Sequence, residues 1–135
     1  MNALRHPPSN YIDGTFVPIP GDAIVSTDPA RPDRVIWSGA APVGHVDDAV
    51  AAARAAFEPW ADRSLDDRIE VLRRWQAVTT AHADALADLI TAEMGKTRAE
   101  SLFEAKALAG KVDITLGPES MSRVAPYTVA VADTR

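Results

Sequence analysis

The sequence contains no cysteine, few aromatic residues (6%) and no long uninterrupted apolar run among its 135 residues. Without cysteine, these residues hold no disulfide framework, no thiolate metal site and no cysteine nucleophile. A membrane-spanning helix needs about 18 or more consecutive apolar residues, and the N-terminus lacks the apolar core of a secretory signal. We therefore expect a cytoplasmic protein that does not enter the membrane.

Excess positive charge is also missing. The formal net charge is -5 and the isoelectric point about 5.1, and the basic residues are interleaved with acidic ones. Nucleic-acid binding requires clustered Lys and Arg to neutralise phosphates, so no nucleic-acid partner is expected. Hydrophobic residues make up 47% of the chain, which is enough for the packed core of one domain or of part of one.

The stretch from Ser64 to Gly117 predicts three consecutive amphipathic helices. Ser64 and Thr97 are typical N-caps, and Thr97 with Glu100 forms a capping-box pattern. Gly95 and Gly117 are typical of helix C-termini. The predicted buried faces repeat at helical spacing and comprise Leu65, Ile69, Leu72 and Trp75; Leu86, Leu89 and Ile90 within residues 82–94; and Leu102, Ala105, Ala109, Val112 and Leu116.

The N-terminal part predicts strands and one more helix. Residues 1–9 resemble a loose lead. Asp13-Gly14 between β-forming residues then predicts a tight hairpin over Asn10–Val17. Short strands are predicted at Ile24–Thr27 and Val35–Gly39, on either side of a turn over residues 28–32. A helix is expected from Val46 to Pro59, with a buried face of Val46, Ala49, Val50, Ala53, Phe57 and Trp60.

After the helices, residues 118–125 are expected to form a loop and Tyr127–Ala132 a strand. The predicted class is therefore α/β, with a β-hairpin, about four amphipathic helices and a terminal strand. These isolated strands do not complete a sheet-based domain. We therefore expect the chain to be part of a longer domain, and only marginally folded when isolated because faces meant for a sheet would be exposed.

No arrangement of side chains in this sequence predicts a catalytic, cofactor-binding or metal site. Gly95-Lys96-Thr97 resembles the end of a phosphate-binding loop, but the glycine required five residues earlier is replaced by Ile90. A helix stop followed by an N-cap explains it better. G-x-G-x-x-G, the dinucleotide fingerprint, does not occur. The remaining candidates favour structural roles, namely His6, His45, His82, the pairs Asp47-Asp48 and Asp66-Asp67, and the core candidates Trp37, Trp60 and Trp75.

Glu93 and Glu104 are the two carboxylates most in need of a partner. Glu93 lies beside the helix-ending Gly95, and Glu104 lies among apolar residues of the last long helix. A partly enclosed carboxylate requires a partner, such as a Lys, an Arg or a cation. A structural ion pair is favoured over a bound ion for both.

Taken in order, the N-terminal motifs resemble the aldehyde dehydrogenase family. They are Asn10-Tyr11-Ile12-Asp13-Gly14, Phe16-Val17, the segment Val46–Phe57 with Trp60, Arg68, and Glu93-Met94-Gly95-Lys96 followed by Glu104. The similarity extends from about Asn10 to Leu116. Within the family, two segments resemble the enzymes that oxidise N-succinylglutamate 5-semialdehyde to N-succinylglutamate in arginine breakdown. They are Ala53–Phe57 with Trp60-Ala61, and the run from Glu100 through Lys111–Thr115.

The resemblance implies that residues 1–135 form the N-terminal part of a Rossmann-type NAD(P)-binding domain. In such enzymes a cysteine attacks the aldehyde, hydride passes to NAD(P), and a glutamate activates water to release the acid. All of these groups lie downstream in the family and none corresponds to a residue here. The resemblance further implies a homo-oligomer when the protein is full length. It also implies a monovalent cation near Ser26-Thr27, for which Glu104 is the matching acid.

NAD or NADP is thus expected in the intact enzyme and not on this segment alone. Calorimetric titration of the 135-residue chain with NAD should give no saturable heat, since the sequence lacks the dinucleotide fingerprint. Saturable binding would contradict this expectation. The alternatives are a catalytically inert remnant and a helical module that binds a partner protein. The second leaves the Tyr11–Val17 hairpin and the Tyr127–Ala132 strand without a sheet.

Overall fold

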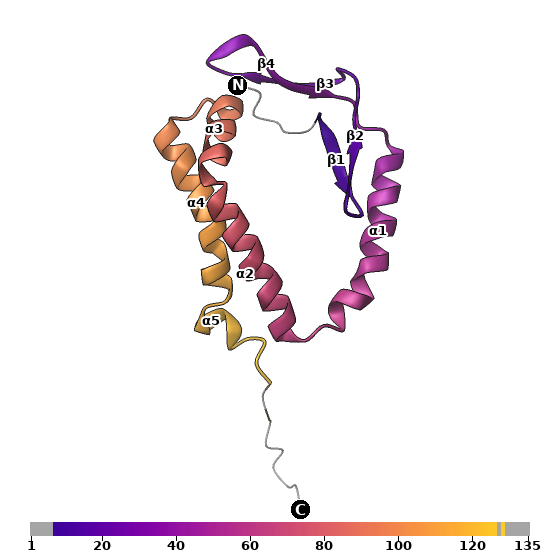
Figure 1. Ribbon diagram of the computed structural model, residues 1–135, viewed down its shortest axis with the longest axis vertical. Helices are drawn as coiled ribbons and strands as arrows, with labels where there is room; N and C mark the ends of the chain where they lie inside the picture. The colour runs from indigo at the N-terminus through magenta and orange to yellow at the C-terminus, as the bar shows by residue number, and fades with distance from the viewer. Residues whose placement is uncertain (1–6, 127, 129–135) are drawn as a thin grey trace, which may run out of the picture.

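Two β-hairpins and a series of helices follow one another around an open frame (Figure 1). The computed structural model describes residues 7–126 and 128, which form two small antiparallel sheets and five helices. The elements are β1 (Ser9–Ile12), β2 (Thr15–Pro18), β3 (Ile24–Asp28), β4 (Arg31–Gly39), α1 (Gly44–Ala61), α2 (Leu65–Ala81), α3 (Ala83–Met94), α4 (Arg98–Thr115) and α5 (Pro118–Met121).

The first hairpin confirms the turn predicted at Asp13-Gly14. Both residues have positive φ, 47° and 75°, as a two-residue turn matched to strand twist requires. β1 and β2 are antiparallel, with Ile12 opposite Thr15. The lead predicted over residues 1–9 ends earlier than expected, because Ser9 already pairs with Pro18 in the sheet.

The second hairpin joins the two strands predicted on either side of the Asp28 turn. β3 and β4 are antiparallel, but β4 begins at Arg31, so the turn is shorter than predicted. The cause is the Asp28 carboxylate, which accepts the Ala30 N–H at 3.0 Å and the Arg31 Nε–H at 3.0 Å. These bonds close the turn and start the strand at once.

Ser64, Gly95 and Thr97 cap their helices as predicted. Helix α4 also ends beside Gly117, but Gly117 is extended, with φ of -69°, and not left-handed as expected. Ser64 Oγ accepts the Asp67 N–H at 3.1 Å, and Thr97 and Glu100 form the reciprocal capping box at the start of α4. Gly95 ends α3 in the left-handed conformation, with φ of 68°. Local hydrogen-bonding chemistry therefore sets these helix boundaries.

Small residues form the core between α3 and α4. Ala87 and Ala105 are almost fully buried, and Ala83 joins them. Ser101 is also fully buried, and its hydroxyl accepts a 2.9 Å bond from Thr91 Oγ1. Because methyl side chains occupy little space, the two helices can pack closely against each other. Half-buried apolar residues surround this core, namely Leu86, Ile90 and Leu102.

Ion pairs on the outside tie the helices together. Arg98 of α4 donates to Asp84 at 2.7 Å and to Asp88 at 2.6 Å, both on α3. These hydrogen bonds raise the pKa of the Arg98 guanidinium. Arg73 of α2 pairs with Asp113 of α4, and with Gln76 it lowers the pKa of the Asp113 carboxyl. The three helices thus form one packed unit.

The prediction that one face of α1 is buried is wrong. No residue of α1 is buried, and Val46 and Phe57 remain 62% and 68% exposed. The helical spacing is real, but the helix lies across the frame from α2–α4 and packs against β1 (Figure 1). The helix also continues past Pro59 to Ala61, because the Asp62 N–H bonds to the Glu58 carbonyl at 3.0 Å.

The faces predicted for the other helices are confirmed in part. On α4, Ala105, Ala109 and Val112 are buried. On α2, Leu65 and Trp75 are exposed, which contradicts their predicted burial. The remaining members of the predicted faces are half-buried, namely Ile69, Leu72, Leu86, Leu89, Ile90, Leu102 and Leu116.

After α4 the chain forms a helical turn where a loop was predicted. Pro118 starts α5 at the first helical position, where its missing N–H costs nothing. The strand predicted at Tyr127–Ala132 lies outside the described residues, apart from Thr128. Within the described part of the chain, no helix combines the length and apolar character needed to cross a bilayer.

Gly95 offers a test of how α3 meets the second hairpin. An added Cβ would lie 3.2 Å from Pro29 Cβ, and φ is left-handed. We expect Gly95→Ala to lower the stability of this junction by about 1–2 kcal/mol, the usual cost of this conformation for an L-residue. Thermal denaturation measures the loss. Gly44→Ala, with nothing within 4 Å of its added Cβ, is the control and should change little.

Candidate functional site

Glu93, near the end of α3, hydrogen-bonds to both strands of the second hairpin. Its Oε1 accepts a 3.0 Å bond from Ser26 Oγ of β3 and a 2.5 Å bond from Trp37 Nε1 of β4. Gly95, two residues later, brings the end of α3 against the turn of this hairpin. Glu93 therefore anchors the β3–β4 hairpin to the helices.

The structure places Glu93, and not Glu104, against Ser26. Glu104 was the expected match, but Ser26 contacts Glu93 instead. Glu104 pairs with Lys96, as the expected structural ion pair. Glu93 was predicted to need a cationic partner, but its partners are a hydroxyl and an indole. Among the described residues, no group of three or more His, Asp or Glu side chains is arranged to hold a metal ion.

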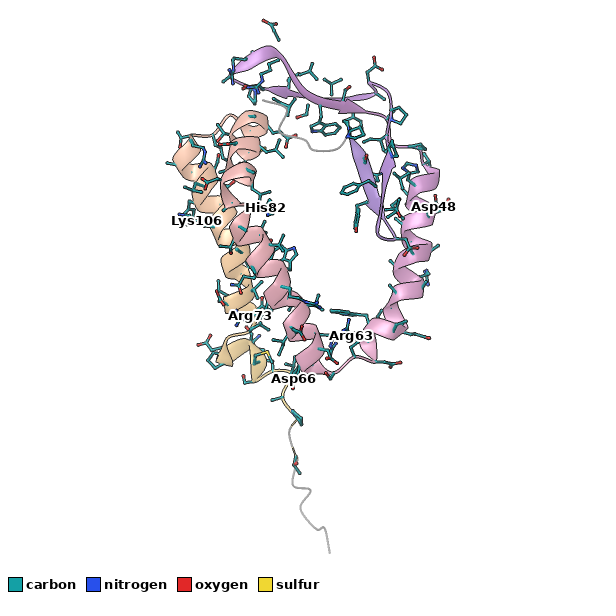
Figure 2. The ribbon with its side chains drawn as sticks, in the orientation of Figure 1. Asp48, Arg63, Asp66, Arg73, His82 and Lys106 are labelled. Atoms are coloured by element: carbon teal, nitrogen blue, oxygen red, sulfur yellow. The ribbon has the colours of Figure 1, made fainter. Side chains whose placement is uncertain are left out.

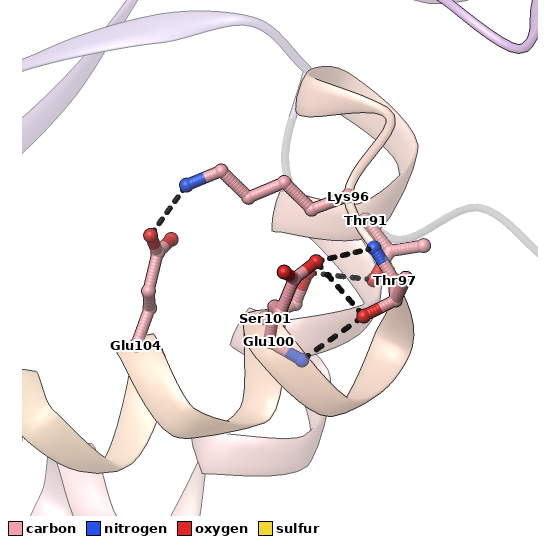
Figure 3. A network of polar contacts seen from close by, with 6 residues as sticks. All are labelled: Thr91, Lys96, Thr97, Glu100, Ser101 and Glu104. Carbon is pink, nitrogen blue, oxygen red and sulfur yellow. Dashed lines mark hydrogen bonds and ion pairs between the residues drawn. The ribbon is translucent and has the colours of Figure 1, made fainter.

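Residues Gly95-Lys96-Thr97 form a junction between two helices (Figure 3). Thr97 Oγ1 accepts the Glu100 N–H at 3.3 Å, and the Glu100 carboxylate accepts the Thr97 N–H at 3.3 Å. Lys96 extends to Glu104 on the next turn. This geometry confirms the helix-stop and N-cap interpretation. The capping box occupies the Thr97 and Glu100 N–H groups at this helix start.

The histidines within the described residues have structural partners. His45 Nδ1 accepts from Asn10 Nδ2 at 3.0 Å, which links β1 to the start of α1. His82 Nδ1–H donates to the Val78 carbonyl at 2.8 Å, at the end of α2. This contact agrees with the structural role predicted for His82. His6 lies outside the described residues.

The paired aspartates do not converge. Figure 2 shows Asp48 beside the start of α1 and Asp66 at the start of α2, at opposite ends of the frame. Asp47 and Asp66 lie in the first turns of their helices, where a negative charge complements the helix dipole. Their positions support the helix starts and provide no shared acid–base cleft.

Of the three tryptophans, one joins the second hairpin to α3 and the other two are exposed. Trp37 is half-buried and donates to Glu93. Trp60 is 40% exposed and Trp75 43% exposed, so their predicted core positions are wrong. The Arg63 guanidinium lies 5.8 Å from the Trp60 ring centroid.

An open groove of about 610 Å³ separates β1 from α1. Its walls are mainly apolar, and its polar pair, Asn10 and His45, is satisfied internally. No Asp, Glu, Ser, Thr or Lys is among the residues that line the groove with them. The lining includes Tyr11, Ile12, Pro42, Val43, Val46 and Val50.

Among the described residues, Asp28 is the most buried charged group, with 2% of its surface exposed. Burial raises the pKa of its carboxyl, but the Ala30 N–H and the Arg31 and Arg34 guanidiniums together lower it below its usual value. The Arg34 Nη1 lies 3.5 Å from Asp28 Oδ2. A buried carboxylate is thus held ionised at the turn of the second hairpin.

Because the pKa of Asp28 is lowered on folding, its contribution to stability is present above its unfolded pKa, near 3.8. That contribution is lost as the pH falls through the lower folded value. We expect Asp28→Asn to destabilise the hairpin at pH 7, and the difference from wild type to shrink below about pH 4. Melting temperatures measured from pH 7 to pH 2.5 test this. Asp33→Asn, at an exposed carboxylate of the same hairpin, is the control.

Comparison with known proteins identifies the family of this chain. The sequence model described as "Aldehyde dehydrogenase family" matches residues 16–130. The chain is 42% identical over 107 residues to N-succinylglutamate 5-semialdehyde dehydrogenase 2 of Caulobacter vibrioides, covering 78% of this chain. It is 42% identical over 109 residues to N-succinylglutamate 5-semialdehyde dehydrogenase of Ectopseudomonas mendocina, covering 80% of this chain.

A third relative, N-succinylglutamate 5-semialdehyde dehydrogenase of Pseudomonas fluorescens, is 40% identical over 117 residues, which is 86% of this chain. In all three comparisons the match spans 22% of the relative's length. The family model nevertheless covers most of this chain. The chain therefore belongs to the aldehyde dehydrogenase family.

Proposed function

We propose that this chain is the N-terminal part of an enzyme that oxidises N-succinylglutamate 5-semialdehyde to N-succinylglutamate with NAD or NADP, a step of arginine breakdown. The observation that carries the proposal is the 42% identity over 107 residues to a dehydrogenase named for that substrate. Two further relatives at 40–42% identity carry the same substrate in their names.

Within that enzyme, residues 1–135 contribute the N-terminal part of a Rossmann-type NAD(P)-binding domain. The exposed apolar face of α1, including Val46, Val50 and Phe57, supports a sheet that later segments complete. An apolar helix face stabilises a domain when it packs against a second layer of secondary structure. The role of this part is then to support the domain, while catalysis belongs to the later residues.

The dinucleotide does not fit the described residues on their own. The one loop with phosphate-binding character, Gly95-Lys96-Thr97, is a helix junction in which Lys96 is paired with Glu104. The sequence also lacks the cysteine that thioester chemistry requires. Cofactor binding, hydride transfer and acyl transfer are therefore assigned to the rest of the polypeptide.

The proposal is tested with the intact protein purified from its source cells. The protein is incubated with N-succinylglutamate 5-semialdehyde and either NAD or NADP. Formation of the reduced cofactor is followed by its absorbance at 340 nm, and the acid product is identified by mass spectrometry. We expect equal amounts of reduced cofactor and N-succinylglutamate. Faster turnover of an unsuccinylated semialdehyde would contradict the substrate, and no cofactor reduction with any aldehyde would contradict the enzyme class.

A further inference from the structure

The turn between β1 and β2 places an aspartate directly before a glycine. Of the aspartates in the sequence, only Asp13 has a glycine as its next residue. Glycine has no Cβ, so the backbone nitrogen of Gly14 is less hindered than that of any other residue type. Such a nitrogen can attack the carboxyl group of the preceding side chain. The dipeptide Asp13-Gly14 is therefore a candidate site for a covalent change in the backbone.

The fold leaves both reacting groups accessible. Asp13 and Gly14 are exposed, and a Cβ added at Gly14 would meet nothing within 4 Å. Among the residues that the structure describes, neither the Asp13 carboxylate nor the Gly14 N–H has a hydrogen-bond partner. Figure 1 shows this turn at the end of the hairpin farthest from β3 and β4. Ring closure requires rotation of the Gly14 peptide, and the open space around the turn permits it.

We propose that Asp13 isomerises spontaneously to isoaspartate in the folded protein. The Gly14 nitrogen attacks Cγ of the protonated Asp13 carboxyl, so that an N–Cγ bond forms and a C–O bond breaks. Water leaves, taking up the proton of the nitrogen, and a cyclic succinimide remains. A water molecule then opens the ring. Attack at Cγ restores aspartate, whereas attack at the main-chain carbonyl gives isoaspartate, with the same mass and with no oxidant or reductant involved.

Isoaspartate would weaken the first hairpin, because it adds one carbon atom to the main chain within the turn. The turn has two residues, with φ of 47° and 75°, and it sets Ile12 opposite Thr15. In a hairpin, the length and type of the turn fix the register of the strands. A lengthened turn no longer matches this register. We expect the pairing beside the turn to loosen, including the contact of the Tyr11 and Phe16 rings, whose centroids are 4.9 Å apart.

The test follows the native protein during long incubation at neutral pH and physiological temperature. Samples are denatured and digested with endoproteinase Asp-N, which cleaves before aspartate and not before isoaspartate. Cleavage at Asp13 is compared with cleavage at Asp22, an exposed aspartate outside the strands that is followed by Ala23. A second sample is incubated in denaturant. This experiment does not depend on the proposed function, because it measures no enzymatic activity.

We expect the Asp13 site of the native protein to lose cleavage several-fold faster than the Asp22 site, without a change in peptide mass. The native rate should lie within a few-fold of the rate in denaturant, because the turn is open. Equal rates at the two aspartates would overturn the proposal. An Asp13 site that stays cleavable in the native protein, but not in denaturant, would show that the hairpin protects it and would also overturn the proposal.

Asp13→Asn provides a second, independent measurement. Asn-Gly suits the same turn, so the hairpin should form, and the same ring now closes with loss of ammonia. We expect the peptide to gain the mass that accompanies conversion of an amide to an acid, and to do so faster than Asp13 isomerises. Asn10 is the internal control, because it is followed by Tyr11 and its amide is bonded to His45. Conversion at position 13 no faster than at Asn10 would contradict the proposal.

The structural consequence is measured by hydrogen exchange of the isomerised protein after its separation from the unmodified protein. We expect the amides of β1 and β2 to exchange several-fold faster and those of α2–α4 to keep their rates, because local openings are independent of distant elements. Unchanged protection of β1 and β2 in the isomerised protein would contradict the expected loss of register.

Discussion

Replacing Ala87 by leucine is expected to lower the local stability of α3 and α4 by about 1–3 kcal/mol, the usual cost of overpacking a core. Ala87 has no exposed surface and lies against α4 in the cluster with Ala83 and Ala105. The larger side chain must separate the two helices. It would also strain the bond between Thr91 and Ser101.

Native-state hydrogen exchange of the α3 and α4 amides measures this loss. Ala85→Leu is the matched control, because Ala85 lies two residues away on the same helix and is exposed. The two substitutions have the same effect on helix propensity. Equal exchange in both variants would contradict the close packing of α3 on α4.

Removing the Glu93 carboxylate is expected to release the β3–β4 hairpin from α3. Glu93→Ala leaves the Ser26 hydroxyl and the Trp37 indole without their acceptor. A hydrogen bond to a charged group contributes about 1.5–3 kcal/mol, and we expect a loss of this size in the exchange protection of β3 and β4. Trp37 emission should also move to longer wavelength.

Trp37 emission is measured in a background in which the exposed Trp60 and Trp75 are replaced by Phe. Glu93→Gln keeps one acceptor oxygen and should lose less than Glu93→Ala. Glu58→Ala, an exposed carboxylate on α1, should leave the hairpin unchanged. A hairpin as well protected in Glu93→Ala as in the wild type would show that other contacts hold it.

Features set by nearby residues could be predicted from the sequence. The hairpin turn at Asp13-Gly14, the N-caps at Ser64 and Thr97, and the left-handed Gly95 all depend on residues within a few positions. Each has a stereochemical cause that acts in any fold. The buried stripe of α4 followed for the same reason, since its spacing has a clear period.

Features that depend on distant contacts could not be predicted. The apolar spacing of α1 indicates a face that packs, but it does not name the element that covers it, and the described residues leave it exposed. Glu93 and Glu104 are both carboxylates near a helix junction. Only the fold shows that Ser26 reaches the first and Lys96 the second.

The central claim is that this chain is one part of a longer dehydrogenase, and the intact mass of the native protein tests it most directly. The protein can be captured from cell extract with an antibody against α2–α4 and analysed whole by mass spectrometry. The account predicts a mass several times the 14.4 kDa of these residues. A native mass of 14.4 kDa would contradict it and favour an inert remnant or a partner-binding helical module.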